Sequence, residues 1–196
     1  MEISLNEFTR FAVANSNNKV QTLTHIKSSQ NSVYAPEKDY YKYLREGVIN
    51  YEDGSLSLAD FQVLNIGLSD SRKTTGYQAP LNGYTTWRGQ FSGQGLSVVK
   101  KRWSNGSLVV KVNPTICIED GGLKNHIIVN FKKEPFSQDR VNVMTTVMNE
   151  VYNNNSDRSY ILNVRDQNLL TVTPSATHSL RVVMEAAALQ AIWPQV

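Results

Sequence analysis

The fold is decided by residues 108–132, LVVKVNPTICIEDGGLKNHIIVNFK. Apolar residues recur there at every second position, which is typical of a strand with one buried face. These residues are Val110, Val112, Ile116 and Ile118. Pro114 interrupts the alternation and indicates an edge or a bulge. The Gly121-Gly122 pair predicts a tight turn, and residues 126–132 predict the next strand.

Further strands and helices flank this stretch. Residues 96–103 predict a strand that turns at Asn105-Gly106, the strongest short hairpin signal. Downstream, the pattern predicts a helix over 137–152, a strand over 159–165, and a last helix capped by Ser175 or Thr177 that runs to Trp193. The order β-β-β-α-β-α predicts an α+β fold, with a mixed β-sheet and helices packed on it.

The N-terminal part is predicted to be helical. Ser4 and Glu7 form a capping box, with Ile3 and Phe8 at the staple positions, so a helix is expected over 5–14. The other elements expected before residue 70 are a short strand over 20–26, a helix that Pro36 opens and Gly47 ends, and a helix from Ser57.

Residues 71–95 are rich in Gly, Ser, Thr and Gln, and only a weak helix is predicted there, over 79–91. We therefore expect three parts within one compact unit. These are a helical part over 1–70, a flexible connector over 71–95 and a mixed-sheet core over 96–196.

The composition restricts the class of protein. The chain of 196 residues has 20 Lys and Arg against 17 Asp and Glu, and its net charge of +3 requires no polyanionic partner. One cysteine excludes a disulfide framework and a zinc site built from cysteines. No apolar run is long enough to span a membrane, and MEISLNEFTR lacks the basic and apolar regions of a signal peptide. We expect a cytoplasmic protein that does not bind a membrane.

No metal site and no cofactor are predicted. None of His25, His126 and His178 has a second ligand three or four residues away. His126 is expected to be solvated at the end of a hairpin, and Cys117 is expected to be a small core residue. The chain has neither a G-x-S-x-G elbow nor a phosphate-binding glycine loop.

The order of elements after residue 96 resembles the core of the PD-(D/E)XK nucleases. Such a nuclease site needs an acid on one strand and an acid-x-Lys on its neighbour, so that two carboxylates hold Mg²⁺. Here Asn130 stands two residues before Lys132, where the acid should be. The resemblance therefore implies a degenerate, non-cleaving relative.

Pairing about the glycine turn supports the same interpretation. It places Asn113 opposite Lys132 and Thr115 opposite Asn130, so no acid faces the lysine. Glu119 and Asp120 fall at the turn, about ten residues along the strand from Lys132, which is too far for a shared site.

The chain also resembles a bacterial protein family without an assigned activity. That family tends to show N-P-E and K-L-Y-F-K where this chain has Asn113-Pro114-Thr115 and Val129-Asn130-Phe131-Lys132. The other similar segments are 161–165 and 185–187, near Trp193. The resemblance implies no function, and its departures remove an acid at Thr115 and a base at Asn130.

Glu185 lies in an apolar stretch of the last predicted helix. One interpretation is an exposed glutamate near Arg181, one turn earlier. The other is a half-buried carboxylate with a raised pKa, which would mark a site.

Basic residues form two main clusters, Lys100-Lys101-Arg102 beside Trp103, and Lys132-Lys133. If both lie on adjacent strands of one sheet, they make a cationic strip with a stacking residue, a surface suited to nucleic acid. The alternative is a solvated sheet face.

Three classes of function remain open. The first is a non-catalytic interaction subunit of a bacterial or phage assembly linked to genome defence, which binds a protein partner or itself. Its contact candidates are Tyr40, Tyr43 and Trp193. The second is a nucleic-acid-binding protein that uses the basic clusters. The third is a metal-dependent nuclease that uses Glu119, Asp120 or Glu134 with Lys132.

Overall fold

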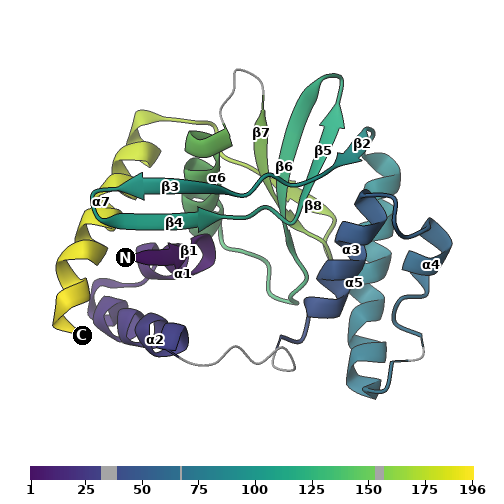
Figure 1. The fold of residues 1–196 in the computed structure, drawn as a ribbon, viewed down its shortest axis with the longest axis horizontal. Helices are drawn as coiled ribbons and strands as arrows, with labels where there is room; N and C mark the ends of the chain where they lie inside the picture. The colour runs from purple at the N-terminus through teal and green to yellow at the C-terminus, as the bar shows by residue number, and fades with distance from the viewer. Residues whose placement is uncertain (32–38, 67, 153–156) are drawn as a thin grey trace.

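A computed structural model describes residues 1–31, 39–66, 68–152 and 157–196, and shows an α+β fold (Figure 1). The strands are β1 (Glu2–Ser4), β2 (Gln94–Leu96), β3 (Lys101–Asn105), β4 (Leu108–Val112), β5 (Ile116–Asp120), β6 (Leu123–Asn130), β7 (Arg158–Asn163) and β8 (Asn168–Leu170). The helices are α1 (Leu5–Ala12), α2 (Lys19–Asn31), α3 (Lys42–Glu52), α4 (Leu58–Gln62), α5 (Ser71–Gln90), α6 (Gln138–Tyr152) and α7 (Ala176–Ile192). Short 3₁₀ turns cover Ser16–Asn18 and Trp193–Gln195.

The strands form two sheets, where the sequence predicts one. The larger has the order β2-β5-β6-β7-β8, and the smaller has the order β1-β4-β3. Within the larger sheet β5 and β6 are antiparallel, whereas β6 and β7 are parallel and joined through α6. The prediction of a mixed sheet with helices packed on it is therefore confirmed.

Pro114 marks the place where the chain leaves the small sheet and enters the large one. The predicted strand over 108–119 is two strands, because β4 ends at Val112 and β5 begins at Ile116. The predicted strand over 96–103 is divided in the same way between β2 and β3. The hairpin at Asn105-Gly106 is confirmed, but it belongs to the small sheet.

The turn at Gly121-Gly122 is confirmed and fixes the register of β5 against β6. Both glycines have positive φ, 59° and 80°, as a two-residue hairpin turn requires. Ile116 lies opposite Ile127, so Thr115 lies level with Ile128 instead of Asn130. The predicted register is wrong by two residues, which leaves the same side chains on each face of the sheet.

Two hydrophobic cores cover the two faces of the large sheet (Figure 1). The first core is formed by α1, α2, α6 and α7 with β3 and β4, and it includes Ile161 of β7. The second is formed by α3, α4 and α5 with β5, β6 and β7. The polar residues between these two cores create the site described below.

The N-terminal helix and its cap are as predicted. The Ser4 side chain accepts from the Glu7 amide, and the Glu7 carboxylate accepts from the Ser4 amide, which completes the capping box. Ser57 and Ser175 also cap their helices as expected.

Some of the other predictions for the first 95 residues are wrong, whereas the weak helix predicted over 79–91 is confirmed as part of a longer helix, α5. Residues 20–26 belong to α2, whose buried Leu23 and Ile26 are spaced for a helix. Pro36 lies outside the described residues. The helix α3 continues through Gly47, which packs so closely against Leu64 that a Cβ would lie 2.3 Å from it. The absence of a side chain at Gly47 allows Leu64 to pack closely against α3, and the glycine does not end the helix.

Residues 71–95 form α5 and β2 instead of a flexible connector. Tyr77, Leu81 and Tyr84 are buried at helical spacing, and this packing outweighs the low helix propensity of the glycines and of Pro80. Gly83 meets the carbonyl oxygen of Val164, where no side chain fits. Among the described helices, none combines the length and apolar character needed to cross a membrane.

Candidate functional site

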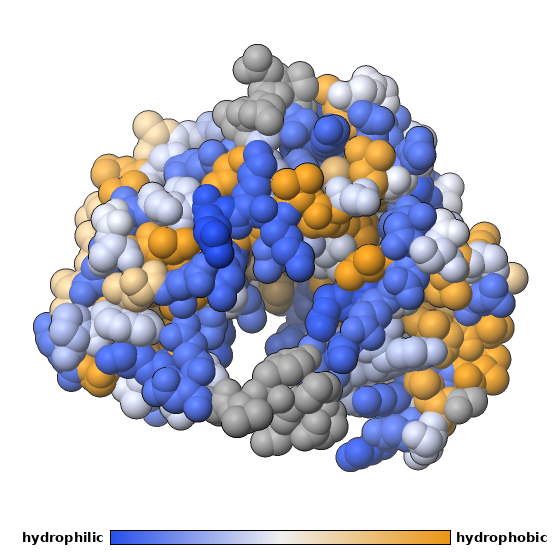
Figure 2. Space-filling view, in the orientation of Figure 1, coloured by the Kyte–Doolittle hydropathy of each residue, from blue (hydrophilic) through white to orange (hydrophobic). Residues whose placement is uncertain are grey.

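A cavity of about 390 Å³ lies between the two helical layers, beside the C-terminal end of β6. Figure 2 shows the hollow near the centre of the face, with hydrophilic residues on both sides. Its walls come from the start of α1, the start of α3, the β4–β5 link, the end of β6 and the start of α6. The described lining residues are Ser4, Leu5, Asn6, Asp39, Tyr41, Arg45, Lys111, Asn113, Thr115, Ile128, Val129, Asn130, Phe131, Lys132, Phe136, Arg140 and Met144.

The charges that line the cavity are mainly positive. Arg45, Lys111, Lys132 and Arg140 face a single described acid, Asp39. Asp39 pairs with Arg45 at 2.7 Å, and Lys111 lies 3.5 Å from Glu2. Among the described residues, no acid lies within ion-pair distance of Lys132 or Arg140.

Three helices begin at this cavity. Its lining includes Ser4 at the N-cap of α1, Tyr41 at the N-cap of α3, and Phe136, two residues before the start of α6. A helix N-terminus carries roughly half a positive charge, and its free N–H groups favour anions. At α1 the capping box already supplies Glu7 as the negative partner, whereas the first turn of α3 has no acid. The acid in the first turn of α6, Asp139, pairs with Arg181 of α7 and does not line the cavity. The cavity therefore has the electrostatic character of an anion site.

The two neutral positions identified in the sequence, Thr115 and Asn130, lie in this cavity. The Thr115 hydroxyl accepts from the amide of Val129 at 3.0 Å. The Asn130 amide group donates to the Glu134 carbonyl oxygen and to Asn163 Oδ1, each at 3.0 Å. A carboxylate at this position lacks those two donors. Asn130 therefore organises the loop after β6, and this explains why no acid stands there.

Glu119 and Asp120 lie far from Lys132, as the sequence predicts. Asp120 pairs with Leu123 at the hairpin turn, whereas Lys132 follows the other end of β6. The Glu134 backbone carbonyl binds Asn130, and its side chain does not line the cavity. In the described part of the chain, no three His, Cys, Asp or Glu side chains are grouped as metal ligands.

The predicted cationic strip does not exist as one surface. Lys101, Arg102 and Trp103 belong to β3 in the small sheet, whereas Lys132 and Lys133 follow β6 in the large sheet. The Trp103 ring is 6% exposed and contacts Phe8, so it cannot stack on a base. Lys100 and Lys133 are exposed and line no part of the cavity, although Lys132 does.

The inner face of β3 is occupied by contacts within the protein. The Trp103 indole donates to Glu150, and Lys101 Nζ donates to the Val151 carbonyl oxygen at 2.7 Å. On the outer face, Arg102 pairs with Glu2. The alternation of a strand separates these cations, because neighbouring side chains point to opposite faces.

Glu185 forms an ion pair with Lys19 of α2, and its side chain is 20% exposed. The predicted contact with Arg181 is wrong, because Arg181 pairs with Asp139. Glu185 thus fastens α7 to α2, and this role needs no reaction chemistry.

The three interaction candidates differ in their exposure. The Tyr40 ring packs against Tyr77, and its hydroxyl donates to the Arg72 carbonyl oxygen. The Trp193 ring is covered in part by Lys27, whose Nζ lies 5.1 Å from the ring centroid. Tyr43 is 44% exposed and has a surface suited to a partner.

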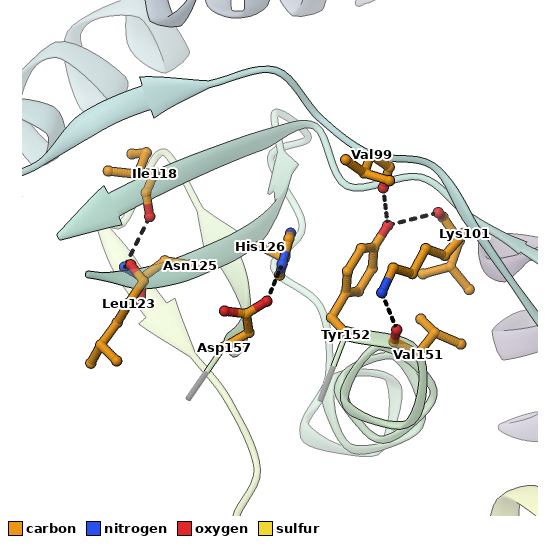
Figure 3. A network of polar contacts seen from close by, with 10 residues as sticks. Val99, Lys101, Ile118, Leu123, Asn125, His126, Val151, Tyr152 and Asp157 are labelled. Carbon is orange, nitrogen blue, oxygen red and sulfur yellow. Dashed lines mark hydrogen bonds and ion pairs between the residues drawn. The ribbon is translucent and has the colours of Figure 1, made fainter. Parts of the chain in front are cut away.

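His126 lies in a second polar network, shown in Figure 3. The prediction of a solvated histidine is wrong, because the side chain is 4% exposed and its ring stacks on Tyr152 at 3.9 Å. Burial lowers the pKa of His126, against the opposing effect of Asp157 at 3.3 Å. Burial also raises the pKa of Tyr152 to about 12.

The same network contains the cysteine. Cys117 is paired with His126 across β5 and β6, and is buried as predicted. Burial raises the pKa of its thiol, which makes it a poor nucleophile. The Tyr152 hydroxyl donates to the Val99 carbonyl oxygen at 2.6 Å (Figure 3). This network is packed and holds α6 on the sheet.

Sequence reasoning identified Asn113, Thr115, Asn130 and Lys132 but missed Arg45, Lys111 and Arg140. The missed residues come from three separate segments, and no spacing rule connects them. Comparison with protein-family models, with curated proteins and with solved structures finds no match.

Proposed function

We propose that this protein is a non-catalytic subunit that binds nucleic acid by taking a phosphate group into the central cavity. The observation that carries the proposal is the pair of cations, Lys132 and Arg140, which have no acid partner among the described residues, in a cavity where α3 and α6 begin. Phosphate is the anion that lysine, arginine and helix N-termini commonly bind together. A nucleic-acid ligand also fits the cytoplasmic location expected from the sequence.

Aromatic rings in the same cavity favour nucleic acid over a simple anion. The half-buried rings of Tyr41 and Phe136 line it beside the cations, and Tyr41 stacks on the buried Phe131 with a centroid distance of 6.1 Å. Rings beside a basic surface are the usual composition of sites for unpaired strands. The neutral Thr115 and Asn130 support binding without cleavage, since a hard cation needs carboxylates.

The test compares two adjacent lysines. Fluorescence anisotropy with short labelled DNA and RNA, single-stranded and duplex, measures affinity at ~50 mM and ~200 mM salt. Lys132→Ala is expected to weaken binding about tenfold, the loss of one good charge-assisted contact. Lys133→Ala is the matched control and is expected to change affinity less than twofold, because its side chain does not line the cavity.

Two results would contradict this proposal. One is the absence of binding to every probe at the lower salt concentration, and the other is an equal loss for both lysine variants. Cleavage of the probes in Mg²⁺ or Mn²⁺ would replace a binding subunit with a nuclease.

A second candidate function is a protein-interaction subunit, and it rests on α7. Leu180, Val183 and Met184 are 60%, 40% and 62% exposed on the outer side of this helix. Exposed apolar residues grouped on one helix face favour a protein partner. Sedimentation analysis of the wild type and of Met184→Glu tests whether this face binds a second copy, and a monomer in both would exclude that partner.

A further inference from the structure

Arg140 keeps donors that the described part of the protein does not use. Its Nη2 donates to Asn6 Oδ1 at 2.9 Å, and its guanidinium carbon lies 4.2 Å from the centroid of the Phe136 ring. Its Nε is buried, and no described group accepts from it. A guanidinium has five N–H donors in a planar fork. The donors left for a ligand are those of Nη1 and the second N–H of Nη2, for which the structure gives no described acceptor.

The environment of Arg140 is unfavourable for a cation without a ligand. Burial lowers the pKa of Arg140, and the nearby charge of Arg10 lowers it further. The only described hydrogen-bond acceptor of its side chain, Asn6, is neutral. A half-buried charge is normally paired, and an anion in the cavity would supply the pair.

The number of cations without an acid partner in the cavity indicates how much negative charge the anion should carry. Asp39 compensates Arg45, and Glu2 lies between Lys111 and Arg102, at 3.5 Å and 3.1 Å. Lys132 and Arg140 have no described acid partner, and Lys111 shares its one acid with Arg102, so the described residues leave at least two positive charges. An internal phosphodiester carries one negative charge, whereas a phosphomonoester carries about 1.5 to 2 near pH 7. The starts of α3 and α6 also favour the more highly charged group.

We propose that Arg140 and Lys132 bind a terminal phosphomonoester, either the phosphorylated end of a nucleic-acid strand or a free nucleotide. This inference rests on the proposed function and specifies which phosphate enters the cavity. Arg140 supplies the planar fork, which matches two phosphate oxygens, and Lys132 supplies a compact charge. Tyr41 and Phe136, which are half-buried, provide apolar and aromatic surface for the attached nucleoside.

The experiment uses one short single-stranded sequence in three forms, with a 5′-phosphate, with a 3′-phosphate and with hydroxyls at both ends. At least one phosphorylated form is expected to bind about tenfold more tightly than the hydroxyl form. Competition with adenosine monophosphate distinguishes the two sources, since displacement of the oligonucleotide indicates that a free nucleotide is sufficient.

The advantage of the phosphorylated form is expected to shrink between pH ~7.5 and ~5.5, because the second phosphate pKa is about 6. The charged groups at the site are Asp39, Arg45, Lys111, Lys132 and Arg140, with Arg10 nearby, and no described lining residue is a histidine. The pH effect should therefore be seen with the phosphorylated form and be much smaller with the hydroxyl form.

Arg140→Gln is expected to abolish the advantage, and Arg140→Lys to retain part of it, with folding verified by circular dichroism. Equal affinity of all three forms for the wild type would overturn this inference and leave the proposed function intact. An advantage that persists in Arg140→Gln would overturn the role of Arg140. Failure of every form to bind would overturn both proposals.

Discussion

The two ends of α6, which packs beside β6, differ in how the protein balances the charge of the helix terminus. Because α6 connects two parallel strands, it runs antiparallel to β6, and its N-terminus lies near the end of that strand. At the C-terminus of α6, Lys101 Nζ donates to the Val151 carbonyl oxygen and lies 5.0 Å from the centroid of the Tyr152 ring. At the N-terminus, the cavity contains the cations Lys132 and Arg140 and no described acid that neutralises them.

The two ends of α6 therefore differ in their contacts. A cation from the protein complements the negative end of the helix, and His126 with Tyr152 fills the remaining space. At the positive end, the acid in the first turn of α6, Asp139, pairs with Arg181 and does not line the cavity. We call the C-terminal end of α6, with Lys101, His126 and Tyr152, the filled end, and its contacts stabilise the fold. The N-terminal end borders the cavity with Lys132 and Arg140, where we propose that a ligand binds.

The strongest test of the filled end is Tyr152→Ala. Tyr152 is 1% exposed and stacks on His126, so its truncation is expected to lower the free energy of unfolding by about 3–5 kcal/mol. Urea denaturation measures the change. Tyr43→Ala, at a residue that is 44% exposed, is the control and should stay within about 0.5 kcal/mol of the wild type. Similar losses for both variants would show that the network is not packed as described.

Asn130→Asp tests the hydrogen bonds at the edge of the cavity, and its expected loss of stability is smaller than that of Tyr152→Ala. The new carboxylate would face the Glu134 carbonyl oxygen and Asn163 Oδ1, and this should lower the free energy of unfolding by about 1–3 kcal/mol at neutral pH. These contacts raise the pKa of the introduced acid in the folded state, so part of the stability should return on acidification. Urea denaturation near neutral pH and at mildly acidic pH would show this recovery. A variant as stable as the wild type at neutral pH would remove the structural explanation for this asparagine.

His126 should make the stability of the protein depend on pH. Its pKa in the folded protein is below the ordinary value of 6.5, so the unfolded chain takes up the proton first as the pH falls. Stability is therefore complete above pH ~6.5 and falls below it, by at most about 1.4 kcal/mol per pH unit.

Urea denaturation between pH ~7.5 and ~5.5 measures this slope. His126→Gln is expected to flatten it, whereas His25→Gln, at an exposed position, is expected to leave it unchanged. An unchanged slope in His126→Gln would assign the acid sensitivity to other groups.

The smallest effects come from a matched pair of charge removals at the two ends of α6. Lys101→Met is expected to lower the free energy of unfolding by about 1 kcal/mol, because it removes the cation at the helix C-terminus. Arg140→Met is expected to leave stability within about 0.5 kcal/mol or to raise it, because the charge it removes is uncompensated.

Thermal denaturation of both variants, with and without inorganic phosphate, completes this comparison. Phosphate should raise the Tm of the wild type and of Lys101→Met more than that of Arg140→Met. A large loss of stability in Arg140→Met would indicate that Arg140 is a structural residue.

Local signals in the sequence predicted the elements around them well. The capping box of Ser4 and Glu7, the turn at Gly121-Gly122 and the spacing of α6 depend on residues within one or two turns. The same approach predicted only the part of α5 over 79–91 and failed for the rest, because Pro80 and the glycines obscure a helix that is stabilised by distant partners. It also failed for His126, since burial under α6 cannot be read from its position on β6.

The candidate site was predicted only in part, for a related reason. Thr115, Asn130 and Lys132 share one hairpin, so strand pairing brings them together even with the register wrong by two residues. Arg45, Lys111 and Arg140 join them only through the packing of α3, β4 and α6.

The sequence by itself determined the α+β class, the turns, the helix caps and the neutral character of Thr115 and Asn130. These properties follow from near neighbours along the chain, whose geometry short-range sterics and hydrogen bonds control. The tertiary structure decided the division of the strands into two sheets, the closed network around His126 and the convergence of three helix starts on one cavity. Those features depend on burial and on charges brought together from distant segments, which the order of residues does not reveal.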